Sequence, residues 1–234
     1  IGVGTLTRNT TADYNTAVGS YALQKNTTAA QNTAVGYAAL NANTTGASNT
    51  AVGRAALYAN TTGAGNNAYG YPSLETNTTG AGQAITTGAN NCTFGYHSML
   101  STTTGANNAA FGYRSLANQT TGQSNAAFGW QALVSVTDGG YNTAIGQGAG
   151  SNVTTGTTSV YLGYAAQAAA ASDLETIVIV ADGSGAGRVG KGSSTGYINA
   201  NLGSIYQGNN SASWATTSDE RIKKNITDNT VGLD

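Results

Sequence analysis

A glycine that returns every 17 residues constrains the fold of this chain more than any other sequence feature. It ends a short apolar segment, such as Asn-Thr-Ala-Val-Gly at Asn32–Gly36, and a single step is longer, at 25 residues between Gly70 and Gly95. The repeat glycines are Gly2, Gly19, Gly36, Gly53, Gly70, Gly95, Gly112, Gly129, Gly146 and Gly163. This regularity predicts a repeat shaft over residues 1–167, built from ten units with an eight-residue insertion at 83–90.

Hydrophobic residues recur at two fixed places in the unit, one residue before the repeat glycine and four residues after it. The first column holds Ile1, Val18, Val35, Val52, Tyr69, Phe94, Phe111, Phe128, Ile145 and Leu162. The second column holds Leu6, Leu23, Leu40, Leu57, Leu74, Met99, Leu116 and Leu133, and a small residue mostly precedes each member. We expect both columns to stack into one continuous core.

Corner residues separate these apolar positions. Asparagine stands four residues before the glycine in eight units, and a turn of the form Asn-Thr-Thr-Gly recurs, as at Asn43–Gly46. Asparagine and glycine tolerate positive φ, and short β-branched or aromatic segments between fixed corners are typical of a β-solenoid or β-roll. Common helical repeats are longer, above about 30 residues. We therefore expect an elongated all-β fold whose coils, about 4.8 Å apart, form a shaft of about 45–50 Å.

The position after the repeat glycine is often aromatic. These residues are Tyr37, Tyr71, Tyr96, Tyr113, Trp130 and Tyr164. Two apolar side chains per unit bury little surface for 17 ordered residues, so we expect other chains to share apolar surface with this one. The aromatic residues would then pack between chains. The alternative is that they are exposed and bind sugars by stacking.

Charge and composition exclude several function classes. A net charge of −1 with 8% charged residues provides no field for nucleic acids or acidic membranes, and no apolar run reaches the roughly 18–20 residues that insert into a bilayer. One cysteine, Cys92, and one histidine, His97, provide neither a disulfide framework nor a metal site, and we expect no cofactor. Without an N-terminal Met or a signal-peptide pattern, we expect an excerpt or a processed form.

The repeat period fades after Gly163, and we expect a neck and a glycine-rich β segment over residues 168–216. Residues 165–175 have the composition of a short helix or a neck, and Thr176–Ala181 is an unbroken apolar run that predicts a buried strand. Residues 183–192 are rich in glycine but lack the spacing of a phosphate-binding loop, which favours hairpin turns. Residues 196–207 predict another pair of short strands.

The last segment, residues 217–234, differs in composition from the rest of the chain. Residues 217–226, Thr-Ser-Asp-Glu-Arg-Ile-Lys-Lys-Asn-Ile, hold five charges within eight residues, whereas the first 163 residues hold seven. Thr217 and Glu220 have the spacing of a capping box, and acidic residues precede basic ones as a helix dipole favours. We therefore expect a helix to begin here.

Two resemblances follow from these motifs. The repeat resembles the head repeats of trimeric autotransporter adhesins, and resembles more closely the NTAVGYxAL and NTTG arrays of bacteriophage tail-fibre proteins; NTAVGYAAL occurs at Asn32–Leu40. The Ser-Asp-x-Arg-x-Lys-x-Asn-Ile motif from Ser218 resembles the opening of the intramolecular chaperone domain of the peptidase S74 family. That resemblance implies a homotrimeric fibre, intertwined or side by side, whose chaperone releases itself by autoproteolysis.

Carried over by position, the S74 resemblance makes Ser218 the candidate nucleophile and Lys223 the candidate base. A serine–lysine dyad needs a neutral lysine, and residues five apart on one helix point about 140° apart. The pair therefore requires a non-helical serine or a lysine from a neighbouring chain. The family's chaperone domain extends further past this motif than residues 219–234, so we expect the site to be unused here and the chain not to be an enzyme.

These patterns support one leading hypothesis and three alternatives. The leading one is a structural viral tail fibre, located in the virion and outside the cell, that binds other tail proteins and a glycan or protein receptor on the host surface. A bacterial trimeric surface adhesin shares this architecture. The paired threonines, such as Thr27-Thr28, leave an ice-binding solenoid open. A polysaccharide-cleaving tailspike would need two facing carboxylates, for which the shaft offers only Asp13, Glu75 and Asp138.

Overall fold

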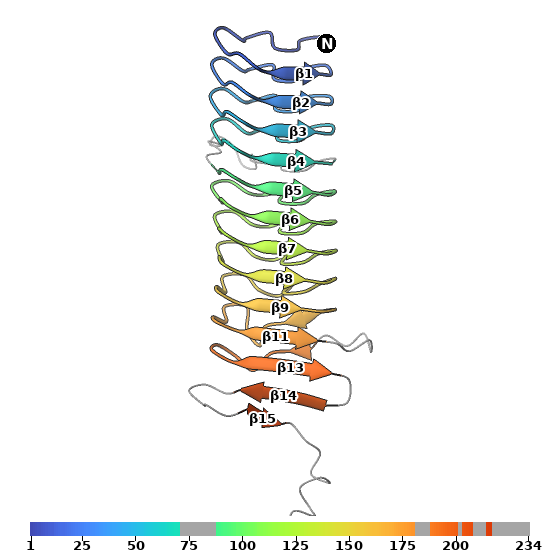
Figure 1. The fold of residues 1–234 in the computed structure, drawn as a ribbon, viewed down its shortest axis with the longest axis vertical. Coiled ribbons are helices and arrows are strands. Elements are labelled where there is room, and N and C mark those ends of the chain that lie inside the picture. Colours follow the sequence, from blue (N-terminus) through green and yellow to red (C-terminus); the bar gives the residue numbers. More distant parts are fainter. Residues whose placement is uncertain (71–87, 181–187, 201–202, 208–213, 217–234) are drawn as a thin grey trace, which may run out of the picture.

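The computed structural model describes residues 1–70, 88–180, 188–200, 203–207 and 214–216, and these form an elongated column of stacked coils (Figure 1). Each coil from the second onward contributes one short strand. These strands are β1 (Thr16–Val18), β2 (Thr33–Val35), β3 (Thr50–Val52), β4 (Asn67–Tyr69), β5 (Cys92–Phe94), β6 (Ala109–Phe111), β7 (Ala126–Phe128), β8 (Thr143–Ile145) and β9 (Val160–Leu162). Neighbours are parallel and in register, with Ala17 beside Ala34. The all-β solenoid expected from the repeat is confirmed.

The repeat glycine is required because successive coils meet there at backbone distance. Gly112 has a φ of 135°, and a Cβ added to it would lie 2.4 Å from the carbonyl oxygen of Gly129 in the next coil. A side chain is therefore excluded both by the backbone conformation and by the neighbouring coil. The fixed 17-residue spacing of glycine follows from this contact.

Hydrogen bonds between coils continue around the corners and do not stop at the strands. The Leu40 amide donates to the Ala56 carbonyl at 3.0 Å, and the Thr44 amide donates to the Thr61 carbonyl at 2.9 Å. Corner residues achieve this with a left-handed backbone, for example Leu40 at a φ of 50° and Ser48 at 59°. Backbone groups on several sides of the coil thus find partners in the adjacent coil.

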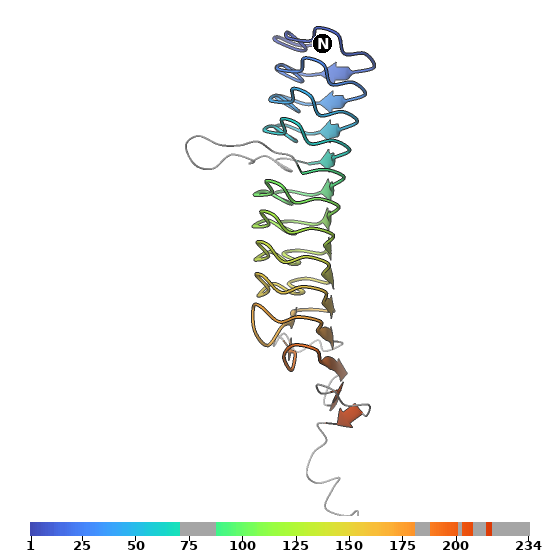
Figure 2. The same cartoon turned by 90° about the vertical axis from the view of Figure 1, so that its left-hand side faces the viewer.

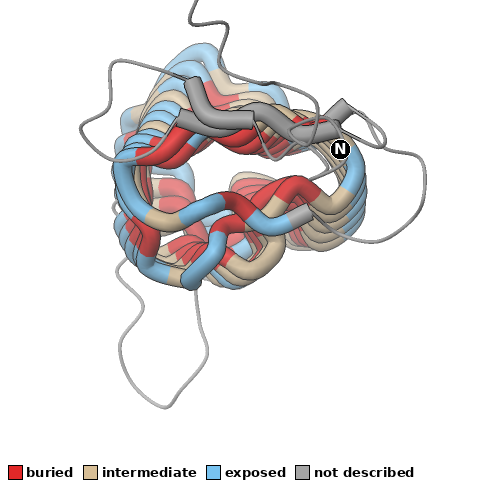
Figure 3. Tube along the Cα trace, turned by 90° about the horizontal axis from the view of Figure 1, so that it is seen from below, coloured by how far each residue is buried: buried red, intermediate tan, exposed pale blue. Residues whose placement is uncertain are grey.

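The core lies inside each coil and is built from two walls. One wall is the central residue of the strand: Ala34, Ala51, Ala68, Thr93, Ala110, Ala127, Ala144 and Tyr161. The facing wall is the column four residues after the glycine, fully buried at Leu23, Leu40, Leu57, Met99, Leu116 and Leu133, as expected. Bands of equal burial line up from coil to coil when the column is viewed along its axis (Figure 3).

The other expected core column, one residue before the repeat glycine, faces outward. Phe94 is 58% exposed, Ile145 49% and Val18 45%. In a strand, neighbouring side chains point to opposite faces, so Val18 and Ala17 cannot both point inward. Alanine takes the inward place because the space opposite it is already filled by the leucine column, and the larger residue is therefore on the surface. The expectation that both columns stack in the core was wrong.

A ladder of buried asparagines accompanies the core. The Asn108 side-chain oxygen accepts the backbone N–H of Asn125 at 2.9 Å, while its amide nitrogen donates to the Asn91 side chain at 3.1 Å and to the Gly122 carbonyl at 3.1 Å. The same pattern links Asn49, Asn66, Asn91, Asn108, Asn125 and Asn142. These bonds satisfy polar groups that the turn would otherwise leave unpaired inside the coil.

This core closes within a single chain. The buried walls contain residues of one chain, and the described coils leave no large core side chain open to solvent between Leu23 and Leu133. The solenoid itself therefore does not need the shared core that we expected from two apolar residues per unit. Any contribution of other chains has to come from the outer surface.

The column continues past residue 167, beyond the point where the sequence repeat fades. The further strands are β10 (Ala166–Gln167), β11 (Ile177–Val180), β12 (Arg188–Val189), β13 (Gly196–Ala200), β14 (Gly203–Gln207) and β15 (Trp214–Thr216). β11 and β13 extend the parallel sheet, with Val178 between Tyr161 and Tyr197, and β13, β14 and β15 pair antiparallel. The expected strand pair at 196–207 is confirmed.

Two expectations for this region require correction. Residues 165–175 form turns and β10, so the alternative of a short helix was wrong, and no helix occurs in the described ranges. Ile177 in β11 is 45% exposed while Val178 is fully buried, so this strand is half-buried despite its apolar run. Because β11 continues the sheet of the shaft, it inherits one inner face and one outer face.

Candidate interaction surface

The outer face of the parallel sheet lies on one side of the column, and the corners lie on the other (Figure 2). Strand alternation turns the first and third residues of each strand outward. We define the outer strip as the residues three before, one before and one after each repeat glycine. In this strip the column three before the glycine is small or of medium size, for example Thr33, Cys92 and Ala109. The outer strip is therefore flat along the column three residues before the glycine, and apolar along the two columns beside it.

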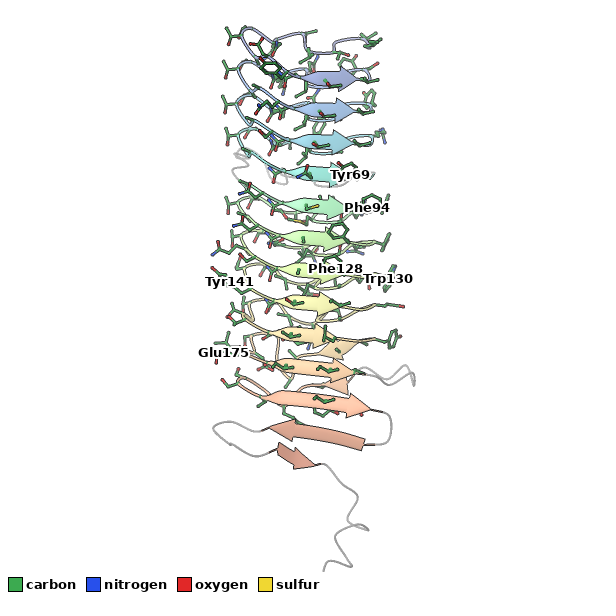
Figure 4. The ribbon with its side chains drawn as sticks, in the orientation of Figure 1. Tyr69, Phe94, Phe128, Trp130, Tyr141 and Glu175 are labelled. Atoms are coloured by element: carbon green, nitrogen blue, oxygen red, sulfur yellow. The ribbon has the colours of Figure 1, made fainter. Side chains whose placement is uncertain are left out.

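The column one residue before the glycine becomes aromatic in the middle of the shaft. Phe111 and Phe128 stack with ring centroids 4.9 Å apart at an interplanar angle of 6°. The ring centroids of Tyr69 and Phe94 are 6.0 Å apart. Tyr69, Phe94 and Phe128 project from the strands, and Trp130 lies at the edge where the strands end (Figure 4). Exposed aromatic and aliphatic side chains thus form one continuous row.

A second aromatic row runs along the column after the glycine. Tyr96 and Tyr113 stack at 5.6 Å with an interplanar angle of 4°, and Tyr113 and Trp130 stack at 5.9 Å with 11°. The other neighbour of Tyr96 is His97, whose ring lies 4.0 Å away at 16°. The rings therefore turn their faces toward one another along the column and turn their edges outward.

Charge is scarce on the outer strip. Among its described residues the one charged side chain is Arg54, which lies 5.7 Å from the centroid of the Tyr37 ring. Several hydrophobic side chains along the outer strip are about half exposed to solvent. These are Tyr37, Phe94, Trp130 and Ile145, at 47–58%. Contiguous apolar surface of this extent marks an interaction site in soluble proteins.

The opposite edge of the column is different in character. Tyr141 and Glu175 lie there, away from the outer strip (Figure 4), and both have a left-handed backbone, with φ of 60° and 53°. Tyr14 occupies the equivalent place in an earlier coil and is 84% exposed. Single exposed aromatics without a stacking partner in the adjacent coil make this edge an unsuitable continuous contact surface.

The paired threonines lie at a corner; Thr10 and Thr11 in the first coil are both exposed, and in the described pairs of the next three coils one member is exposed and the other is partly buried. Thr27 is partly buried and donates its hydroxyl to the Thr44 carbonyl at 3.1 Å, while Thr28 is exposed. Asp138 interrupts the exposed column and accepts the hydroxyls of Thr120 and Thr121 at 2.9 and 2.7 Å. Asp138 therefore interrupts the exposed threonine row on which the ice-binding alternative depends.

The candidate dyad, the insertion and the candidate carboxylates lie apart from the outer strip or outside the described residues. Ser218 and Lys223 lie outside the described residues, as does most of the insertion at 83–90. Within that range, Gly88 already takes the place of Gly63 and Gly105 in the regular coil, accepting the Asn66 side chain at 2.9 Å. Asp13 precedes β1 and Asp138 lies between β7 and β8, so these two are many coils apart and do not form the facing pair of a tailspike active site; Glu75 lies outside the described residues.

The described ranges contain no group of three or more His, Cys, Asp or Glu side chains that could hold a metal ion. No helix in the same ranges has the length and apolarity needed to cross a membrane. His97 stacks on Tyr96, and Cys92 is a partly buried free thiol on the outer strip.

Sequence reasoning identified the aromatic column after the glycine but missed the rest of the outer strip, because it assigned the apolar column before the glycine to the core. A signal was present in the three-residue strand Thr-Ala-Val of β2: if Ala34 points inward, Thr33 and Val35 must share the outer face. The left-handed corners at residues such as Leu40 had no sequence signal, since leucine does not favour that backbone conformation.

Comparison of the chain with protein-family models, with curated proteins and with solved structures finds no match.

Proposed function

We propose that this chain is the shaft of a structural viral tail fibre that mediates attachment to the host cell surface. The observation that carries the proposal is the unbroken, in-register stack of β1 to β9 and β11, which makes a straight rod of about 50 Å. Such a rod separates a binding end from the body to which it is attached. Hydrogen bonds between successive coils resist bending, because a bend would break them on one side of the column.

The proposal includes a homotrimer in the virion, joined to other tail proteins and contacting a glycan or protein receptor on the host. It is supported by the NTAVGYAAL unit at 32–40 and by the S74-like motif that begins at Ser218, both of which resemble parts of tail fibres. A bacterial trimeric surface adhesin remains the alternative, since the same shaft serves either protein.

The attachment role is tested by adsorption. Fluorescently labelled chain is incubated with a broad panel of bacterial strains, with labelled serum albumin as the control for non-specific adsorption. Saturable binding to a subset of strains, competed by unlabelled chain, is the expected result. Binding to no strain above the albumin control would overturn the attachment function.

The S74-like site is tested by mass spectrometry. If Ser218 is a nucleophile for autoproteolysis, the wild-type chain yields a fragment that ends next to residue 218, and Ser218→Ala and Lys223→Ala do not. Equal fragment patterns for all three chains would remove Ser218 and Lys223 from the proposal.

A further inference from the structure

We infer that the outer strip is the surface through which copies of this chain associate side by side, with their sheet faces toward one another. The inference rests on the proposed fibre, which needs several chains, and adds the face that joins them. Thr33, Val35 and Tyr37 show the composition of one coil of this face: a small polar residue, an aliphatic residue and an aromatic residue.

The dimensions of the strip match a protein interface. Ten coils about 4.8 Å apart, crossed by side chains over a width of about 13 Å, give a face on the order of 600 Å². Stable interfaces bury about 600–1,000 Å² on each partner.

The stacking geometry argues against a sugar as the occupant. A sugar ring binds to the open face of an aromatic ring, whereas the faces of Tyr113 are directed at Tyr96 on one side and Trp130 on the other. In the neighbouring row, the face of Phe111 is covered by Phe128 at 4.9 Å. Tyr113, with a ring on each face, therefore exposes its ring edge, which packs against apolar protein surface.

The length and straightness of the strip point to a second copy and not to a globular partner. A compact protein covers only part of a face about 50 Å long, whereas another solenoid has the same rise for every coil and matches it throughout. Copies that run in one direction, as in a fibre, also bring residues of equal size to equal height. The coils with aromatic residues from Tyr69 to Phe128 then lie opposite the same coils of the other copy, and Val18 lies opposite its aliphatic equivalent.

Two pairs of substitutions test the face. Phe94→Asp with Ile145→Asp places two charges on the outer strip, and Tyr14→Asp with Tyr141→Asp places two on the opposite edge, at side chains of similar or greater exposure. Aspartate tolerates the left-handed backbone of Tyr14 and Tyr141. Molar mass is measured by light scattering, with circular dichroism and thermal unfolding to show that each variant is folded.

We expect the wild-type chain and the opposite-edge variant to have a mass near three times 23.3 kDa, and the outer-strip variant to have a mass near 23.3 kDa. A wild-type mass near 23.3 kDa, or an outer-strip variant that is folded and still associated, would overturn the inference. If the outer-strip variant does not fold, cross-linking of the wild-type chain through Cys92 tests whether copies meet through this face.

Cys92 provides that measurement without changing the face. It is the single cysteine of the chain and lies on the outer strip, midway along the shaft. In copies that meet through this face, a short bismaleimide adds one thiol to each of its two double bonds and yields a covalent dimer. We expect dimer bands on a denaturing gel from the wild-type chain and none from Cys92→Ser. Associated wild-type chains that give no dimer would exclude this face.

The outcomes separate the inference from the proposed function. A folded, monomeric chain that adsorbs to cells leaves the attachment function standing and overturns the inference. Chains that associate through Cys92 and the outer strip, but adsorb to no strain, support the inference and overturn the attachment function.

Discussion

Left-handed backbone at residues other than glycine is a recurrent cost in this solenoid. Each coil has such residues, for example Leu57 at a φ of 52° inside the core and Gln31 at 62° on the surface. This conformation costs about 1 kcal/mol or more per residue. Leu57 is held there by its burial, but exposed members of the set have no comparable packing to offset the strain.

Thr158 is the exposed position at which relief of this strain is easiest to measure. It is β-branched and has a φ of 58°, and glycine already occupies the equivalent place at Gly65. We expect Thr158→Gly to raise the free energy of unfolding by about 1 kcal/mol. Thr155→Gly, at a nearby exposed position without positive φ, should lower it by about 0.5–1 kcal/mol. Chemical denaturation of both variants checks the prediction, and destabilisation by Thr158→Gly would contradict it.

Tyr161 and Gly150 compensate for each other in size within the core. Gly150 stands where other coils have leucine, and a Cβ on it would lie 2.6 Å from Leu133 Cδ2 and 3.0 Å from Tyr161 Cδ2. Tyr161 in turn stands where other coils have alanine and is fully buried. The large ring of Tyr161 therefore fills the space that a leucine at position 150 would take.

Burial raises the pKa of the Tyr161 phenol above its ordinary value of 10.0. In the unfolded chain the phenol ionises first as pH rises, so the stability that depends on the neutral form is complete below pH of about 10 and is lost above it. We expect Tyr161→Phe to lose less stability than the wild type between about pH 9 and 11. Denaturation at several pH values measures this; parallel curves for the two chains would contradict it.

At the scale of the element, the buried asparagine ladder joins each coil to the next. Removing the Asn108 side chain takes away the oxygen that accepts the Asn125 backbone N–H, and removes one of the two hydrogen bonds that the Asn91 side-chain oxygen accepts. We expect Asn108→Ala to lower the free energy of unfolding by about 2–3 kcal/mol. Asn118→Ala, at an exposed asparagine, should change it by less than about 0.5 kcal/mol. Equal effects in the two variants would show that the ladder adds no stability.

The elements show how far sequence reasoning reached. The strand ending at each repeat glycine and the leucine wall were predicted from the 17-residue spacing, and in the structure Gly112 meets the next coil at backbone distance and Leu40 is fully buried. The turn at 165–175 could not be predicted in this way, because its alanines are equally suited to a helix. Only the pairing of β11 with β9 shows that the solenoid continues through this segment. Pairing with a neighbouring coil overrode local helix propensity there.

The same limit applies to the candidate site. Exposed aromatics after the glycine were visible in the sequence, but the orientation of their rings was not, and that orientation distinguishes sugar stacking from contact between chains. Stacking of Tyr113 between Tyr96 and Trp130 depends on the register of three coils, which only the folded column fixes.

At the scale of the whole molecule, association through the outer strip should be insensitive to salt. Arg54 is the one charged side chain among the described residues of this face, so burial of apolar surface supplies the free energy. We expect the dissociation constant to change less than about threefold between about 0.05 and 1 M NaCl, where exposed charges are screened. Sedimentation equilibrium at both concentrations measures it. A tenfold weakening at high salt would show that charged groups carry the association.

The glycine contact between successive coils has a consequence for how such a shaft evolves. Because Gly36 meets Gly53 in the same way that Gly112 meets Gly129, recombination between the corresponding gene segments can add or remove one whole unit and leave every remaining junction intact. The reach of the protein then changes in steps of about 4.8 Å, with no new side-chain packing to select. A lineage can thus adjust the distance to its target before it alters a single contact residue.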